Sequence, residues 1–165
     1  MTPLPRTVEI RQLADADRGW VERLIGERWG TGGVVGRGRV WNPAELPGFA
    51  AFEDERCVGL VTYELDEEAC EVVTLDALEE GRGIGTALLR AVEDMARAAG
   101  CARVQLLTTN NNLRALALYQ KRGYRLVRLV PGAIDEERRL KPSIPQFDSA
   151  GLPIRDELHL ELPLD

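Results

Sequence analysis

Three glycines within five residues constrain this chain more than any other feature of its sequence. Gly81, Gly83 and Gly85 stand between a strand-like segment that ends near Leu75 and a segment with helical periodicity over residues 86–99. Glycine lets the backbone turn without side-chain clashes, so several amide N–H groups can point at one anion. The helix dipole adds partial positive charge at the same place. Residues 81–85 are therefore predicted to cradle a pyrophosphate.

Three classes of nucleotide-binding protein use a loop of this kind, and spacing separates them. A Walker loop ends in Gly-Lys-Ser/Thr, whereas Gly85 is followed by Thr86 and Ala87, which excludes that class. A dinucleotide-binding loop needs a third Gly or Ala where this chain has Leu88, and its strand opens the domain, whereas the strand here is the fourth. A dinucleotide-binding fold is therefore disfavoured.

The order of predicted elements is that of a mixed α/β fold. Alternation of apolar and polar residues over 7–13 predicts a strand, and Asp15 is expected to cap the helix that follows it. Residues 26–38 contain six glycines and predict an irregular segment. Because a strand-helix-strand crossover returns in the same direction, the strand after the glycine-loop helix should run parallel to the strand before it. Strands over 49–52, 57–65 and 69–75 are predicted to form an antiparallel meander. Three more strands are predicted over 103–108, 124–130 and 158–162. A helix is predicted over 112–122 and a helical turn over 135–141.

Length and charge limit the class of protein. The 165 residues suffice for one compact domain, so residues 1–165 are predicted to form a single domain. A formal net charge of -6 argues against nucleic-acid binding, which depends on Lys and Arg neutralising phosphates. No apolar run reaches the length of a membrane helix, and the first residues lack the apolar core of a signal peptide. We therefore expect no membrane association and a cytoplasmic location.

Cysteine and histidine usage restricts the available side-chain chemistry. The 3 cysteines are widely spaced and predict reduced core residues. His159 is the 1 histidine, so a zinc site or a histidine-based triad is hard to assemble. His159 alternates with the leucines of the last predicted strand and is assigned to the surface. Catalysis is therefore expected to rest on carboxylates, tyrosine and backbone groups, without a metal.

Two stretches in this order resemble the signatures of one enzyme family, the GNAT superfamily of N-acetyltransferases. Residues 75–89 resemble the coenzyme A motif of that family, whose loop reads Gln/Arg-x-x-Gly-x-Gly/Ala. Glu80 stands where that pattern has Gln or Arg. Binding of a pyrophosphate is therefore expected to depend on the backbone amides and on Arg82. Residues 112–124 resemble the second signature, Asn-x-x-Ala-x-x-Leu/Phe-Tyr-x-x-x-Gly-Phe/Tyr, at every named position.

The resemblance implies a fold and a cofactor. The fold is a mixed, mostly antiparallel central sheet of about seven strands flanked by helices, with a parallel pair that splays apart near the cofactor, often helped by a bulge. The cofactor is acetyl-coenzyme A, acting as a co-substrate. The residues that it places against the cofactor are Leu75, Asp76, Ala77, Gly81, Arg82, Gly83, Ile84, Gly85, Thr86, Asn112, Ala115 and Tyr119.

The resemblance also implies direct attack of an amine on the thioester, without a protein nucleophile. Tyr119 is predicted to protonate the departing thiolate. The amine must first lose a proton, and Glu71 is the preferred base, because it lies in the strand that reaches the cofactor and shares its alternation with Val73 and Leu75. Glu64, Asp76 or a water molecule are the alternatives for this role.

The acceptor side carries no clear motif. Trp29, Arg37 and Arg39 are predicted to bind the acceptor, the two arginines through a carboxylate or phosphate, and the loop over 131–156 is expected to close the pocket. The predicted function is acetyl transfer from acetyl-CoA to a primary amine of a small molecule or protein, by a monomer or homodimer. The alternative is a non-catalytic module that senses acetyl-CoA or CoA.

Overall fold

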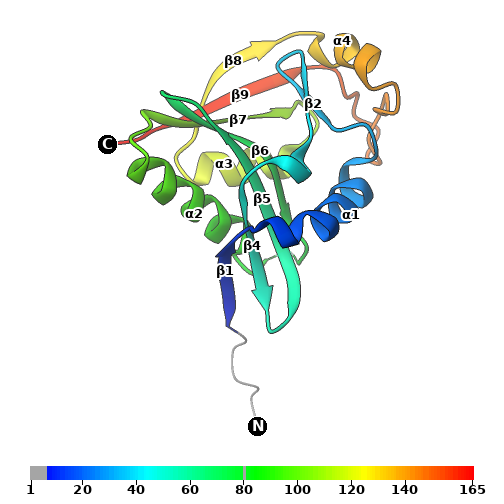
Figure 1. Ribbon diagram of the computed structural model, residues 1–165. Helices are drawn as coiled ribbons and strands as arrows, with labels where there is room; N and C mark the ends of the chain where they lie inside the picture. The colour runs from blue at the N-terminus through cyan, green and yellow to red at the C-terminus, as the bar shows by residue number, and fades with distance from the viewer. Residues whose placement is uncertain (1–6, 80) are drawn as a thin grey trace.

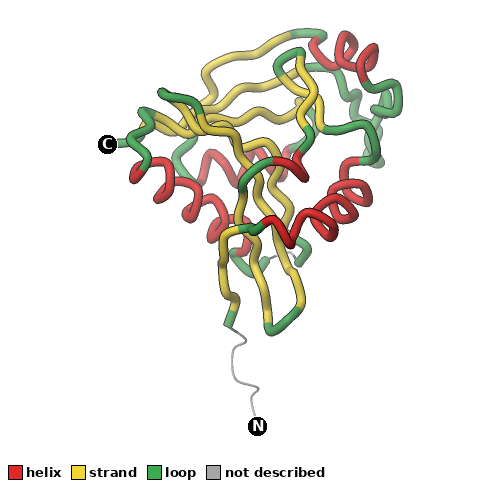
Figure 2. The backbone as a smooth tube through the Cα atoms, in the orientation of Figure 1, coloured by secondary structure: helices red, strands yellow, loops and turns green. Residues whose placement is uncertain are grey.

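The computed structural model describes residues 7–79 and 81–165 and shows one large twisted sheet with helices on both faces (Figures 1 and 2). The 7 strands of this sheet lie in the order β1-β4-β5-β6-β7-β9-β8. They are β1 (Val8–Gln12), β4 (Gly48–Glu53), β5 (Arg56–Leu65), β6 (Ala69–Ala77), β7 (Arg103–Thr109), β8 (Arg125–Val130) and β9 (Glu157–Pro163). The helices are α1 (Arg18–Trp29), α2 (Ile84–Ala98), α3 (Leu113–Lys121) and α4 (Ala133–Leu140).

Strand pairing confirms the predicted mixed sheet. β4, β5 and β6 form the expected antiparallel meander, and β6 and β7 are parallel, as the crossover through α2 requires. The final strand, β9, lies between β7 and β8 and is antiparallel to both. The sheet is therefore mostly antiparallel, with one parallel pair at its centre.

Adjacent residues of β5 show how the two faces are covered. Successive side chains of a strand point to opposite faces. Val61 packs in a core with Leu88 and other residues of α2, whereas Leu60 packs with Val21 and Ile25 of α1. Helices α2 and α1 therefore cover opposite faces of the sheet, as Figure 1 also shows.

A bulge in β6 reshapes the centre of the sheet. Thr74 pairs with Thr62 and Val72 pairs with Tyr63, so Val73 is an inserted residue. Pairing between β6 and β7 covers only 69–72 against 103–106, and beyond that point the register contains no further pair between these two strands in the described chain. The parallel pair therefore splays apart after the bulge, as predicted.

Two segments near the N-terminus differ from the sequence prediction. Asp15 does not cap α1: residues Asp15–Asp17 form a 3-10 turn, and the helix begins at Arg18. Asp17 organises this turn, because its carboxylate accepts hydrogen bonds from Ala14 N at 2.7 Å and Trp20 Nε1 at 2.8 Å. The glycine-rich segment is more regular than expected, since α1 runs to Trp29 and a separate hairpin follows, β2 (Val34–Gly36) with β3 (Arg39–Trp41).

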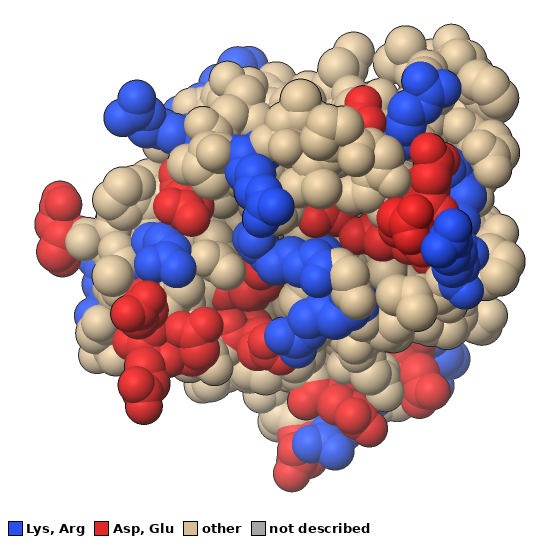
Figure 3. All heavy atoms as spheres, turned by 90° about the horizontal axis from the view of Figure 1, so that it is seen from above, with Lys and Arg blue, Asp and Glu red and all other residues tan. Residues whose placement is uncertain are grey.

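Charged side chains of both signs are interspersed on the surface seen in Figure 3. Among the helices of the described residues, none is long and apolar enough to cross a membrane. The described part of the chain also contains no group of three or more His, Cys, Asp or Glu side chains arranged to hold a metal ion.

Candidate active site

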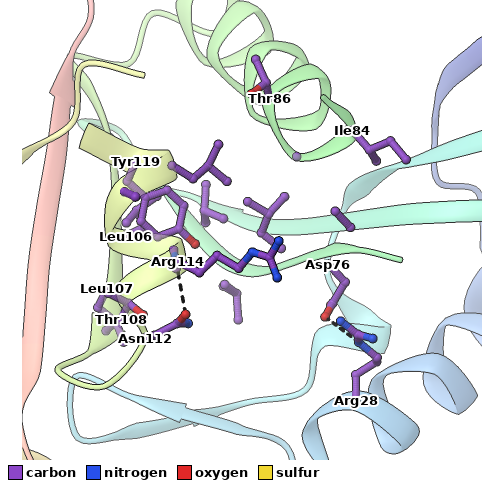
Figure 4. Close-up of a pocket in the computed structure, with 18 of the residues that line it drawn as sticks. Arg28, Asp76, Ile84, Thr86, Leu106, Leu107, Thr108, Asn112, Arg114 and Tyr119 are labelled. Atoms are coloured by element: carbon purple, nitrogen blue, oxygen red, sulfur yellow. Dashed lines mark hydrogen bonds and ion pairs between the residues drawn. The ribbon is translucent and has the colours of Figure 1, made fainter. Parts of the chain in front are cut away.

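A cleft of about 950 Å³ opens where β6 and β7 splay apart (Figure 4). Its walls are the residues of β6 after the bulge, the residues of β7 from Leu106 onward, the start of α2 and one side of α3. The last turn of α1 and the strand β2 line its other end. A cleft of this volume is large enough for an extended cofactor.

The glycine loop forms an anion cradle at one end of the cleft. Gly81 and Gly83 both have a φ of 73°, a left-handed conformation that favours glycine. Gly83 is the N-cap of α2 and has no side chain, so no side-chain hydrogen bond caps the first turn. Gly81, Gly83 and the first residues of α2, Ile84, Gly85 and Thr86, line the cleft. The N–H groups of the first turn of α2 are thus available to an anion. Glu80, the departure from the family pattern, lies outside the described residues.

Arg82 is not among the described residues that line the cleft. Its guanidinium pairs with the carboxylate of Glu53 and, at 2.6 Å, with that of Glu79. It therefore anchors the loop to the sheet rather than pointing into the cradle. Arg114 of α3 lines the cleft instead, and Figure 4 shows its side chain extending into it. Sequence reasoning missed Arg114, although it lies in the second signature, two residues after Asn112.

Helix α3 presents three of the predicted residues to the cleft. Asn112 caps the helix, with its Oδ1 accepting from Ala115 N at 3.3 Å, and both residues line the cleft. Tyr119, two turns further on, is 8% exposed, and Figure 4 shows its hydroxyl directed into the cleft. Burial, with the negative charge of Asp76 as a second cause, raises the pKa of Tyr119 to about 12. Its phenol is therefore held protonated near neutral pH.

Asp76 reaches the cleft from β6. Its side chain is 6% exposed, and its carboxylate accepts hydrogen bonds from Arg28 Nε at 3.2 Å and Trp29 Nε1 at 3.0 Å. Both donors come from the last turn of α1, and Arg28, like Trp29, lines the cleft. The neighbouring Leu75 and Ala77 line the cleft as well and pack on the core beneath α2. Asp76 is thus a buried carboxylate in the cavity that Tyr119 enters.

The bulge overturns the alternation predicted for Glu71. Because Val73 is inserted, Cys70, Val72, Leu75 and Ala77 share the α2 face, and Glu71 shares the opposite face with Asp76. Glu71 does not line the cleft in the described chain; its carboxylate pairs with Arg37 and accepts from Gln105 Nε2 at 3.3 Å. Burial raises the pKa of Glu71 despite these partners. The structure therefore does not bring Glu71 and Tyr119 into one cavity.

The two arginines predicted to bind an acceptor are engaged by carboxylates of the sheet. Arg37, at the turn of the β2–β3 hairpin, pairs with Glu71, and Arg39 donates to Glu64 at 2.8 Å. Glu64 and Glu71 are register partners on β5 and β6, so the hairpin is fastened to one adjacent acidic pair. Trp29, in contrast, lines the cleft, and its binding of the acceptor stays a prediction.

His159 is buried, which corrects its assignment to the surface. It is 6% exposed; its Nε2 lies 2.6 Å from Glu157 Oε1 and its Nδ1 lies 3.1 Å from Arg37 Nη1. Glu137 of α4 joins this cluster, and burial together with a hydrogen bond to Glu157 raises its pKa to about 8. The alternation of the last strand was read correctly, but the face opposite its leucines is covered by the β2–β3 hairpin and α4.

An amide cradle at a helix N-terminus, joined to a cleft through a splayed parallel strand pair, defines the class of acyl-coenzyme A-dependent transferases. The sequence profile described as "Acetyltransferase (GNAT) family" matches residues 12–124, and the chain belongs to this family. The match spans both signatures and all of the strands that build the cleft.

Two relatives from Bacillus subtilis (strain 168) extend the similarity over most of the chain. The uncharacterized protein YdhI is 43% identical over 143 residues, which cover 86% of this chain and 89% of YdhI. The uncharacterized protein YxbD is 43% identical over 141 residues, which cover 85% of this chain and 89% of YxbD.

Solved structures share the fold at low sequence identity. An IAA acetyltransferase from Bacillus cereus ATCC 14579 superposes with a TM-score of 0.73 at 20% identity, over 96% of this chain and 100% of that chain. A GNAT family acetyltransferase from Elizabethkingia anophelis with acetyl-CoA bound has a TM-score of 0.68 at 19% identity, over 95% of this chain and 98% of its own.

Proposed function

We propose that this protein transfers the acetyl group of acetyl-CoA to a primary amine by direct attack, with Tyr119 as the general acid. One observation carries the proposal: the buried Tyr119 hydroxyl faces the same cleft that the amide cradle opens onto. A cofactor held by its pyrophosphate in the cradle can extend along this cleft.

The residues present suit acetyl-CoA. The uncapped amides of α2 supply donors to a pyrophosphate, and Arg114 supplies positive charge in the same cavity. Beyond Val72, the inner edge of β6 has no strand partner in the described chain, so backbone groups are available to an extended amide-bearing chain. When bound, acetyl-CoA supplies the activated acetyl group.

Tyr119 is suited to donate a proton as the carbon–sulfur bond breaks. Its raised pKa keeps it protonated, and the pKa values of a phenol and a thiol differ by only about 1.5 in water. The amine nitrogen forms the bond to the acetyl carbon as the carbon–sulfur bond breaks, and the proton of the phenol passes to the departing sulfur. The proton that the acetylated nitrogen then releases restores the phenol. This role requires the hydroxyl and not merely the ring.

The acceptor amine must lose one proton before it attacks, since an alkylammonium has a pKa of about 10. Among Glu64, Glu71 and Asp76, Asp76 is the carboxylate that lines the cleft. We assign it the task of receiving that proton, directly or through a water molecule. Glu71, the base that its predicted strand alternation favoured, pairs with Arg37 and does not line the cleft in the described chain.

Two measurements test the proposal. Thermal unfolding is recorded with acetyl-CoA, CoA and NAD, because a ligand that binds only the folded state raises the unfolding temperature. Thiol release from acetyl-CoA is then followed with a panel of primary amines. Stabilisation by both CoA forms and thiol release with at least one amine support the function. Stabilisation by NAD alone would contradict it, and CoA binding without turnover on any amine would favour a sensing module.

A further inference from the structure

We propose that the end of the cleft formed by α1 and β2 is the acceptor subsite, and that it takes a small apolar primary amine, bound as a cation and lacking a neighbouring carboxylate. This inference rests on the proposed function, because it names the acceptor of that reaction. The position, charge and apolar lining of this end support it.

The position follows from the two faces of the sheet. The amide cradle belongs to α2, which covers one face, whereas α1 covers the other. The same cleft is lined by Gly83 and by Trp29, so it passes between the splayed strands from one face to the other. A cofactor anchored at the cradle leaves the α1 end to the second substrate.

The charge at this end favours a cation. At this end Asp76 and Glu27 present two carboxylates, and α1 also contributes the guanidinium of Arg28, while Arg114 of α3 extends into the same cleft (Figure 4). Arg28 already donates to Asp76 at 3.2 Å. A carboxylate offers about four acceptor positions, and the two donors of α1 use two of those of Asp76. The remaining positions can accept N–H groups from an ammonium, as a charge-assisted hydrogen bond.

An acceptor carboxylate finds no matching partner among the arginines predicted to hold one. Arg37 is bound to Glu71, and Arg39 to Glu64, where both fasten the hairpin to the sheet. A carboxylate next to the amine would lie beside Asp76, which costs repulsion instead of gaining an ion pair. Neither Arg37 nor Arg39 therefore offsets this repulsion for an amino acid.

The lining around Asp76 is apolar. Val34 and Val35 of β2, Leu107 of β7 and the indole of Trp29 border this end. Burying an apolar substituent against them is favourable by roughly 25 cal/mol for each Å² removed from water. An ammonium next to the Trp29 ring also gains a cation–π interaction. An aryl or branched alkyl group beside the amine meets these requirements.

The loop that carries Trp29 is braced by the segment that follows β8. Lys141, just after α4, donates through Nζ to Trp29 O and to Gly33 O, both at 2.6 Å. Helix α4 also contacts β2. In the described chain none of residues 131–156 lines the cleft, so closure of the pocket by this segment stays a prediction.

The test is equilibrium binding, which does not require turnover. Calorimetric titrations use protein saturated with CoA and three probes of equal ring size: 2-phenylethylamine, L-phenylalanine and 2-phenylethanol. The second adds a carboxylate, and the third removes the charge. We expect 2-phenylethylamine to bind at least about tenfold more tightly than either of the others, because only it pairs with Asp76 without repulsion.

Variants assign the effect to Asp76. In Asp76→Asn the affinity for 2-phenylethylamine should fall about tenfold or more, since a charge-assisted hydrogen bond is lost, while the protein still binds CoA. The matched control is Asp94→Asn, the same substitution at a side chain of α2 that is 69% exposed, and it should bind both ligands like the wild type. Measurable CoA binding also shows that Asp76→Asn is folded.

Equal or tighter binding of L-phenylalanine, or full affinity in Asp76→Asn, would overturn the inference. So would CoA binding with no measurable binding of 2-phenylethylamine, even if other amines release thiol. Binding of 2-phenylethylamine without thiol release has the opposite meaning, because it supports the subsite and contradicts the proposed catalysis. The two hypotheses can therefore fail separately.

Discussion

The Tyr119 hydroxyl and the Asp76 carboxylate enter one cleft from different elements, Tyr119 from α3 and Asp76 from β6 beyond its bulge. The negative charge of Asp76 adds to burial in raising the pKa of Tyr119. A group that keeps its proton and a group that can receive one are thus held within electrostatic reach of each other. This arrangement suits a reaction that takes a proton from one substrate and gives one to the other.

Tyr119→Phe should lower kcat about 100-fold, because removing a general acid costs a factor of this order, and should leave CoA affinity unchanged. Steady-state thiol release and calorimetric CoA binding measure the two effects. The control is Tyr63→Phe, which removes a hydroxyl from a tyrosine of the core cluster that does not line the cleft. A Tyr119→Phe enzyme with wild-type kcat would exclude the acid role.

Gly83→Ala should weaken CoA binding, while Gly100→Ala should not. Both glycines have a positive φ, 73° and 82°, and neither would bring a new Cβ within 4 Å of another group. Each substitution should therefore cost about 1 kcal/mol of unfolding free energy for a left-handed alanine, but only Gly83 sets the amides of the cradle. Urea denaturation and calorimetry compare them. Equal CoA affinities in the two variants would place the anion site elsewhere.

Arg37→Met should destabilise the protein by about 3 kcal/mol, because it leaves Glu71 buried without its cation. Adding Glu71→Gln should recover part of the loss, since the unpaired charge disappears. Urea denaturation of both single variants and the double variant measures this coupling. If Glu71→Gln alone keeps full stability and abolishes turnover, Glu71 is the base, as its place in the strand before the glycine loop predicted.

The stability conferred by Glu137 should decline with rising pH. Burial and the hydrogen bond to Glu157 raise its pKa from 4.5 to about 8 in the folded state. Between these values the folded protein holds a proton that the unfolded chain has released, so stability falls by roughly 1 kcal/mol for each pH unit. Glu137→Gln, which stays neutral, should lack this decline when unfolding is followed from pH 5 to about pH 8. Parallel curves of unfolding free energy against pH for the wild type and Glu137→Gln would refute this prediction.

Lys141→Met should loosen the loop over 29–33, because the carbonyls of Trp29 and Gly33 lose their shared donor. Amide hydrogen exchange in this loop should become faster, and the KM for the amine should rise about fivefold or more while CoA affinity holds. Arg139→Met, at an exposed position of α4, serves as the control. An unchanged exchange rate would show that Lys141 does not hold the loop.

The sequence was sufficient for the elements with strong periodicity or capping. The three strands of the meander, α2, and α3 with Asn112 as its cap were predicted within a few residues. These features depend on local contacts, which spacing along the chain records. The central parallel pair followed from the same reasoning, because a crossover fixes strand direction.

The remaining features depend on contacts between distant segments. A bulge at Val73 leaves no mark on the composition of an apolar strand, so the face of Glu71 was predicted wrongly. The ion pairs chosen by Arg82 and Arg37 depend on Glu53 and Glu71, which lie 29 and 34 residues away. Arg28 and Lys141 are brought to the site by folding, through contacts with Asp76 and with the carbonyls of Trp29 and Gly33.

The bulge at Val73 has a consequence for the protein without its ligands. Beyond Val72 and Leu106 the sheet contains two inward-facing edges in its interior, where other strands would exchange hydrogen bonds. Edges of this kind normally occur at the rim of a sheet and invite an added strand. Under the proposed function, an extended ligand chain would pair with these edges and make the sheet continuous. The site is in this sense a missing part of the fold.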